Sequence, residues 1–250
     1  MGRITDTVKH LIIINVLFFI GSKIFGNTAF DLLSLWFPEN KNFHVWQIIT
    51  HMFMHHPTFY FHIIFNMLGI YMFGSPLEQI WGKWRFLFFY FSCGIGAVLL
   101  PMAIDYYHFS DSLNLLLENG FDKAEILNVL NNGQYDTRWA DVLGQDQLNQ
   151  LLNLFNQNSL GASGALMGLL VAFGMYFPNA ALMLIFLPIP IKAKYFIPLL
   201  LAYEIISGFT GGTSLFGINV GHWAHVGGAL MGLVITYYWK KNSFNNRRWD

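Results

Sequence analysis

A serine flanked by glycines and a histidine much later in the chain are the residues best suited to chemistry. Ser163 lies in the run 161–164, which reads Gly-Ala-Ser-Gly, and His225 ends the run 221–225, which reads Gly-His-Trp-Ala-His. A serine hydroxyl is a weak nucleophile until a base removes its proton, and a pKa of about 6.5 makes imidazole the natural base. Ser163 also begins an apolar stretch, so at a helix start its N–H could bind an oxyanion. The alternative is a small serine that packs between membrane helices.

A second polar pair lies in an earlier apolar segment. His62 and Asn66 are four residues apart, which places them on one helix face, a turn from each other. Polar groups in lipid are costly unless they are paired, so they need an explanation. With the orientation predicted below, these two residues, Ser163 and His225 all lie toward the outer ends of their segments. The sequence therefore predicts one pocket that opens to water from outside.

Glycines follow both candidate residues at helical spacing. Gly228 and Gly232 lie three and seven positions after His225, and Gly164 and Gly168 form a second small-residue pair after the serine. Such glycine faces allow two membrane helices to approach closely. We therefore expect these two helices to pack tightly enough for the histidine to reach the serine.

Three other polar residues admit competing interpretations. His51 and His55 have the i, i+4 spacing of two zinc ligands, but no glutamate follows His51 as the H-E-x-x-H pattern requires. Packing in an interfacial loop is therefore preferred for both. Glu204 lies inside an apolar segment, where a structural, hydrogen-bonded role is preferred over an influence on substrate entry. No acidic third member is evident, so the reactive pair is interpreted as a dyad.

The composition is that of a membrane protein. The chain of 250 residues is 54% hydrophobic and 11% charged, whereas a typical soluble domain has about 25% charged residues. A net charge of zero gives no argument for a nucleic-acid partner. A span needs about 20 mostly apolar residues, and six candidates, three of them short, can be identified at 8–24, 59–73, 84–104, 163–177, 195–209 and 222–239.

Two segments depart from this pattern. Residues 105–158 are polar, and the stretches 111–118, 122–130 and 147–156 have leucine and isoleucine at helical spacing, which predicts short amphipathic helices in an aqueous insert. Residues 178–194 contain three prolines around an apolar run that is too short to span, which predicts a turn at the interface. The pair Gly211-Gly212 is expected to form a flexible cap near the pocket.

The Lys and Arg residues predict the orientation, because cytoplasmic loops are enriched in them. If the N-terminus is cytoplasmic, four of the basic residues lie outside (Lys23, Lys41, Lys123 and Arg138), and the other ten lie inside (Arg3, Lys9, Lys83, Arg85, Lys192, Lys194, Lys240, Lys241, Arg247 and Arg248). Both termini are therefore predicted to be cytoplasmic, and the insert is predicted to be outside.

These motifs together resemble the rhomboid family of intramembrane proteases, over nearly all of the chain except 105–158. The run 161–164 is similar to the family's G-x-S-G, which includes the nucleophile. The run 224–232 is similar to A-H-x-x-G-x-x-x-G, which includes the base. His62 and Asn66 fit H-x-x-x-N, and Glu78 fits a structural glutamate near the cytoplasmic end. The order of the motifs and their common depth make the resemblance specific.

The resemblance implies a fold, an activity and a location. The fold is an all-α six-helix membrane bundle, a single domain over 1–250 with an extracytoplasmic insert at 105–158. Ser163 would attack and His225 would act as base, while Gly161 and the side chains of His62 and Asn66 would serve the oxyanion site. The partners would be single-span membrane substrates, cut in or near their transmembrane segment, and the lipid bilayer of a bacterial cytoplasmic membrane. No metal or organic cofactor is implied. A catalytically inactive relative that binds membrane clients is the alternative.

Three details refine this expectation. The family often has Trp-Arg after the first span, where this chain has Trp46-Gln47, and it usually has an aromatic residue where this chain has Met167. His222 lies three residues before His225, nearer the outer water, where it is expected to shape the mouth of the pocket or to bond a loop. His225 is therefore preferred as the base.

Overall fold

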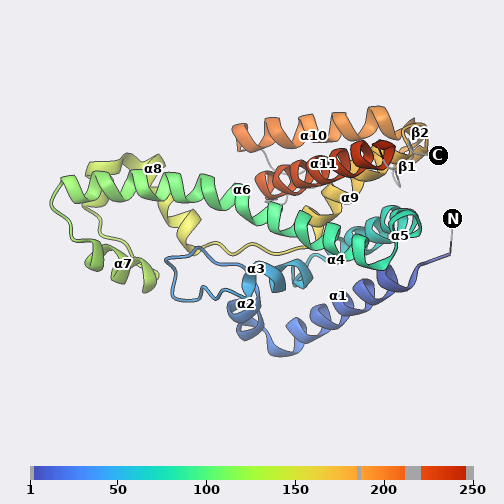
Figure 1. The fold of residues 1–250 in the computed structure, drawn as a ribbon. Coiled ribbons are helices and arrows are strands. Elements are labelled where there is room, and N and C mark those ends of the chain that lie inside the picture. Colours follow the sequence, from blue (N-terminus) through green and yellow to red (C-terminus); the bar gives the residue numbers. More distant parts are fainter. Residues whose placement is uncertain (1–2, 185–186, 212–220, 246–250) are drawn as a thin grey trace.

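The computed structural model describes residues 3–184, 187–211 and 221–245. Helices predominate, and a hairpin lies at one end of the molecule in Figure 1. A 3₁₀ turn (His51–Phe53) and a π-helical turn (Ile70–Gly74) interrupt the series. In chain order the other elements are α1 (Asp6–Phe25), α2 (Asn27–Leu33), α3 (Gln47–Thr50), α4 (Tyr60–Gly69), α5 (Ser75–Trp81), α6 (Lys83–Glu118), α7 (Lys123–Asn131), α8 (Trp139–Asn156), α9 (Ser163–Tyr176), β1 (Ala181–Leu184), β2 (Leu187–Lys192), α10 (Ala193–Thr210) and α11 (His222–Asn245).

The six apolar segments predicted from the sequence all lie in helical regions. Within the described part of the chain, α1 and α6 are long and apolar enough to cross a membrane by length and composition, and α9 is a shorter apolar helix. The second segment is longer than predicted, because α4 continues through the π-helical turn directly into α5. The last two segments lie within α10 and α11.

Helix α6 does not end where the apolar segment ends. The apolar span predicted at 84–104 lies inside a single helix of 36 residues, which continues past the span to Glu118. Between 105 and 118 there is neither glycine nor proline to stop it, and the amphipathic stretch 111–118 simply extends the helical pattern. The helix stops at Asn119 and Gly120, which has a φ of 88°.

The polar segment has a small hydrophobic core of its own. As predicted, its amphipathic stretches are helical, in the last turns of α6, in α7 and in α8. Asp122 caps α7 by accepting hydrogen bonds from the N–H groups of Ala124 and Glu125. The apolar faces meet in a cluster of buried side chains that includes Phe37, Phe109, Leu116, Ile126, Leu130, Trp139, Leu148, Leu151 and Phe155.

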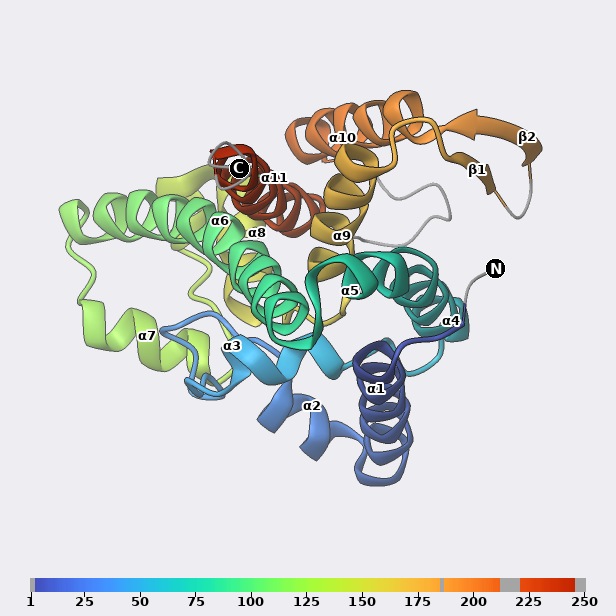
Figure 2. The same cartoon turned by 45° about the vertical axis from the view of Figure 1, so that its right-hand side comes forward.

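Residues 181–192 form an antiparallel hairpin where a simple turn was predicted, so the fold is not purely α. Strand β1 pairs with β2 in the register Ala181 to Lys192 and Leu182 to Ile191. Prolines two positions apart fit this hairpin, because each strand of a two-stranded sheet needs N–H groups on one side only. The hairpin connects α9 to α10 (Figure 2).

Glycines bring α11 into close contact with α9 and α6, as predicted for the first of these pairs. A Cβ atom on Gly232 would lie 2.6 Å from Cα of Gly168, so main chain packs directly on main chain. Gly228 meets the carbonyl of Gly164 in the same way. The contact of α11 with α6 was not predicted from the sequence. Here Gly227 faces the backbone of α6 at Gly96. This packing fixes the first turn of α11 against the first turn of α9.

Glu78 attaches the start of α1 to α5. Its carboxylate accepts hydrogen bonds from the hydroxyl of Thr5 and from the N–H groups of Thr7 and Val8. Those N–H groups lie in the first turn of α1, where no intrahelical acceptor exists. A carboxylate at that end is also favoured by the helix dipole.

Candidate active site

Ser163 and His225 meet where the first turns of α9 and α11 lie together. Ser163 is the first residue of α9, and His225 lies in the first turn of α11, where its N–H donates to the carbonyl of Gly221. The Nε2 atom of His225 is 2.8 Å from Oγ of Ser163. With Nε2 unprotonated, the serine hydroxyl donates this hydrogen bond. The distance is that of a nucleophile within reach of its general base.

His62 approaches the same point from the start of α4. The backbone N–H of His56 donates to Nδ1 of His62 at 3.2 Å, so the neutral ring has its proton on Nε2. The ring of His55 packs edge-on against it, with centroids 5.1 Å apart. A Cβ atom built on Gly161 would lie 2.9 Å from Nε2 of His62 and 3.5 Å from Oγ of Ser163. An N–H donor and the serine oxygen thus converge on one small volume.

Only glycine fits at position 161, between the His62 ring and the serine oxygen. Its φ is 128°, a conformation that side chains with a Cβ rarely adopt, and any Cβ would press on the His62 ring. Its N–H donates to the carbonyl of His51 at 2.9 Å, which holds the turn before α9. The free N–H groups at the start of α9 lie directly after this turn.

Asn66 lies one turn after His62 and is 3% exposed. Its Nδ2 donates to the carbonyl of His62 at 2.8 Å. This bond places the amide on the same face as the imidazole, and one further Nδ2 hydrogen remains for another acceptor. The structure therefore places Asn66 beside His62.

A carboxylate that was not predicted from the sequence faces the second nitrogen of the His225 ring. Its Nδ1 lies 3.1 Å from Oε1 of Glu204, which is on α10. The second carboxylate oxygen, Oε2, lies 2.7 Å from Nδ1 of His222. His222 is 7% exposed, and its contact with Glu204 was not predicted from the sequence. The predicted cap at Gly211-Gly212 falls partly outside the described residues, since Gly212 is not among them.

Gln47 and the two neighbouring histidines organise the segment before α4. The Gln47 side chain is fully buried and donates to the carbonyls of Asp31 and Asn42. His51 and His55 each direct Nδ1 at a backbone carbonyl, of Gln47 and Phe53. Burial lowers the pKa of His51 and that of His55 to about 4. Across the described residues, no three His, Cys, Asp or Glu side chains are grouped as a metal site would need.

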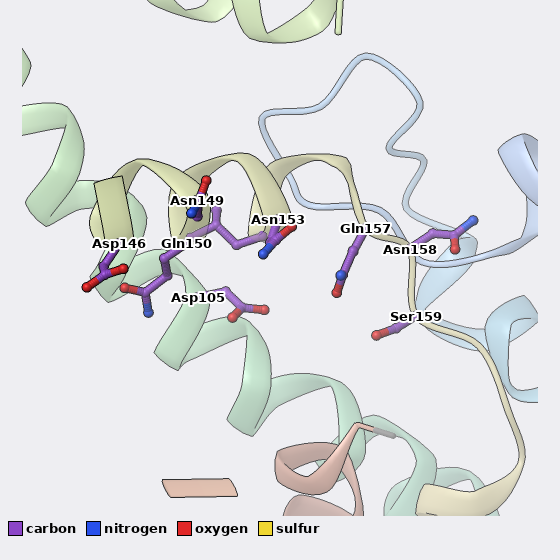
Figure 3. A pocket seen from close by; sticks show the side chains of 9 residues that line it. Asp105, Asp146, Asn149, Gln150, Asn153, Gln157, Asn158 and Ser159 are labelled. Atoms are coloured by element: carbon purple, nitrogen blue, oxygen red, sulfur yellow. The ribbon is translucent and has the colours of Figure 1, made fainter. Parts of the chain in front are cut away.

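A polar cavity of about 450 Å³ lies away from the serine, between α6 and α8 (Figure 3). Asp105 faces it from α6, and amide side chains of α8 line the other wall. Ser159, at its edge, pairs through its backbone with Leu35, immediately before the turn that leads to α9. The cavity thus borders the segment that carries the serine without containing it.

Comparison with known proteins agrees with the motifs. The family model described as Rhomboid domain matches residues 42–111 and 141–242, which is more than half of the chain. A curated relative, the rhomboid protease AarA of Providencia stuartii, is 25% identical over 188 residues, which are 70% of this chain and 50% of the relative. The chain thus spans about half the length of that relative. Residues 112–140, which contain α7, lie between the two matched stretches.

The matched stretches contain the serine of α9, the histidines of α4 and α11 and the glycine-packed helices between them. On this extent of agreement, the chain belongs to the rhomboid family and is an integral membrane protein.

Proposed function

We propose that this protein is an intramembrane serine endopeptidase, in which Ser163 is the nucleophile and His225 is the general base. The observation that carries the proposal is the 2.8 Å contact between Nε2 of His225 and Oγ of Ser163. An inactive client-binding relative would have no need to keep these two atoms in hydrogen-bond contact at buried helix starts.

The geometry supports a complete acyl-transfer cycle. His225 takes the hydroxyl proton through Nε2 as Oγ attacks the scissile carbonyl, and it later returns that proton to the leaving amine. The negative charge that develops on the carbonyl oxygen lies near the N–H of Ser163 and the Nε2–H of His62. Loss of one such donor raises the barrier by about 2.7–4 kcal/mol in a soluble serine protease. Water then hydrolyses the acyl-enzyme by the same proton transfers.

The substrate class follows from the location of the site in a membrane protein. We infer that the substrates are single-span membrane proteins, cut in or near their transmembrane segment, and that the bundle crosses the bilayer six times with both termini in the cytoplasm. The arrangement supports this orientation, because α1 begins and α11 ends at one end of the molecule, while α7 lies at the other (Figure 1). The membrane is proposed to be a bacterial cytoplasmic membrane.

The orientation can be tested with an engineered thiol. Gln134 is exposed after α7, and the native Cys93 is buried and gives no background. Gln134→Cys should react with an impermeant maleimide added to intact cells. Lys83→Cys, at the exposed start of α6, is the matched control and should react only after the cells are opened. The reverse pattern would invert the proposed topology.

The activity is tested with the purified protein in detergent or liposomes. A fluorophosphonate should label the wild type at Ser163, and a single-span substrate should be cleaved. Ser163→Ala and His225→Ala should each lower cleavage by a factor of about 10⁴ or more, as in soluble serine proteases. Both variants should melt like the wild type. Wild-type turnover by folded Ser163→Ala protein would rule out this mechanism.

A further inference from the structure

We propose that Glu204 is a positioning residue for His225, so that the reactive group is a Ser163–His225–Glu204 triad whose acid is supplied by α10. This inference rests on the proposed protease function. It starts from the observation that both ring nitrogens of His225 face a polar group: Nε2 faces Ser163 at 2.8 Å and Nδ1 faces Glu204 at 3.1 Å.

The position of Glu204 selects the tautomer in which His225 can act as a base. Nε2 of a neutral imidazole can accept the serine proton only if the ring hydrogen is on Nδ1. A carboxylate beside Nδ1 favours that tautomer, since it can accept but cannot donate. The 3.1 Å contact has ion-pair distance but not the alignment of a hydrogen bond, and Nδ1 has no other hydrogen-bond partner in the described part of the chain. Glu204 is thus the acceptor that Nδ1 has within reach.

Glu204 also supplies a counter-charge for the protonated His225 ring. When His225 takes the proton from Ser163 it becomes a cation in a site where its side chain is 12% exposed. A buried cation needs a counter-charge. The Glu204 side chain is 8% exposed and lies on the side of the ring opposite to the serine. Its carboxylate therefore stabilises the imidazolium without competing for the proton that the serine gives up.

The carboxylate of Glu204 is itself held in place. Oε2 of Glu204 is 2.7 Å from Nδ1 of His222, which donates to it, and Oε1 is left toward His225. His222 and His225 are one turn apart on α11, so the two oxygens match the two rings. The ring of Tyr203 lies edge-on to His222, with centroids 6.2 Å apart, and supports it from α10.

A purely structural role is the competing explanation: the Glu204–His222 pair would only tie α10 to α11. The two roles predict opposite orders for two substitutions. In Glu204→Gln, His222 occupies the amide oxygen, so the amide NH₂ faces Nδ1 of His225 and donates to it. That bond forces the ring proton onto Nε2, where it blocks the serine. Glu204→Met removes the acceptor without forcing the wrong tautomer. If Glu204 positions His225, Glu204→Gln should therefore have a lower activity than Glu204→Met. If Glu204 only pairs with His222, Glu204→Gln should have the higher activity, because its amide oxygen can still accept that hydrogen bond.

The test measures kcat, KM and fluorophosphonate labelling from pH 5 to 9 for the wild type, Glu204→Gln, Glu204→Met and Glu204→Asp. Glu204→Gln should lower kcat at least tenfold, toward the about 10⁴-fold loss of the corresponding change in a soluble triad, with KM within about twofold. Its acidic limb should move to lower pH, because the carboxylate that stabilises the imidazolium is removed. Glu204→Asp should keep the limb of the wild type. His62 and His222 are the other ionisable groups near His225, and they are unchanged in all four proteins.

Ser207→Ala is the matched control, because Ser207 is a buried side chain on α10, one turn after Glu204. It should leave kcat and the pH profile unchanged. The triad would be overturned by a Glu204→Gln protein whose kcat is within twofold of the wild type and whose acidic limb has not moved. A lower activity for Glu204→Met than for Glu204→Gln would overturn it as well. If Glu204→Gln does not fold, Glu204→Asp decides, since an acidic limb shifted in that variant also overturns it. A wild type that is neither labelled nor active is a different failure, that of the proposed function.

Discussion

Four histidines lie at the candidate site or contact its residues, and their ring contacts give them different roles. His225 directs Nε2 at the serine, His62 has Nδ1 occupied by a backbone N–H, and His222 gives Nδ1 to a carboxylate. His55 gives Nδ1 to a carbonyl. A base needs an unprotonated nitrogen facing the nucleophile, and of these rings His225 is the one that contacts the serine oxygen.

This difference predicts separable effects for the two histidines of α11. His222→Ala removes one support of Glu204 but leaves the serine contact of His225 intact, so we expect activity within about tenfold of the wild type and a shifted pH profile. His225→Ala should have none. Cleavage of one fixed substrate by both proteins from pH 5 to 9 brackets the imidazole pKa of about 6.5. An active His225→Ala protein beside an inactive, folded His222→Ala protein would reverse the roles.

Gly161 gives a second prediction at this scale. Gly161→Ala should lower kcat by about tenfold or more, because the Cβ would displace the His62 ring and strain a backbone with a φ of 128°. Labelling of Ser163 should persist, since the contact with His225 is untouched. Gly21→Ala on α1 is the control, because nothing lies within 4 Å of its Cβ position. Full activity of Gly161→Ala would argue against His62 as an oxyanion donor.

Site residues that belong to short local motifs could be predicted from the sequence, whereas contacts between separate helices could not. Ser163, His225, Gly161 and the H-x-x-x-N pair belong to short local motifs, and the structure brings the first three together with His62. The contact of Glu204 with His225 could not be predicted from spacing. It depends on how α10 is rotated against α11, and the residues between these helices carry no periodic signal of that rotation.

The glycine contacts of α11 operate at the scale of helices. Because main chain lies on main chain at Gly232, no side chain can rearrange to accept added volume. Gly232→Val should therefore cost about 1–3 kcal/mol of unfolding free energy, the range for overpacked interiors, and should separate the serine from its base. Leu233→Val, a change at the neighbouring exposed position, is the control.

Thermal unfolding in detergent measures the first effect, and fluorophosphonate labelling measures the second. Gly232→Val should lower both the melting temperature and the labelling rate, whereas Leu233→Val should leave both close to those of the wild type. Equal melting temperatures for the two variants would mean that the helices of this family member can separate without cost.

At the element scale, hydropathy predicted the positions of the helices well and their ends poorly. Apolar content indicates where lipid or core contact begins, but a helix stops at a breaker, and α6 has neither glycine nor proline between residues 105 and 118. The hairpin of 181–192 was missed because strand pairing is a contact between separate segments. An apolar run interrupted by prolines gives the same local pattern for a turn and for an edge strand.

At the scale of the whole molecule, Glu78 links the N-terminal helix to the rest. Burial opposes ionisation of Glu78, but hydrogen bonds from Thr5, Thr7 and Val8 overcome it and lower the pKa of the carboxyl below its usual value. A depressed pKa in the folded state stabilises the fold above the unfolded value of about 4.5 and stops doing so as the pH falls through the folded value. The attachment of α1 should therefore weaken in acid.

Glu78→Gln should lower the unfolding free energy at pH 7 by about 1.5–3 kcal/mol, the range for hydrogen bonds to a charged group. The difference from the wild type should shrink as the pH is lowered below about 4.5, because the wild-type carboxyl then becomes neutral as well. Asp6→Asn, at an exposed acid in the first turn of α1, is the control and should lose less. A difference that is constant from pH 7 to 3 would contradict the role of the charge.

Helix α6 belongs to both hydrophobic cores, with Cys93 in one and Phe109 in the other. Its 36 residues span about 54 Å, well beyond the about 30 Å of a hydrocarbon layer. The helix can therefore transmit force between the two cores. A sideways force on α7 and α8 would act through α6 on Gly96, where α6 packs against α11. Pro101 removes one backbone hydrogen bond of α6 between these two cores, so we expect such a force to bend the helix there before it disturbs the contact that aligns the serine with its base.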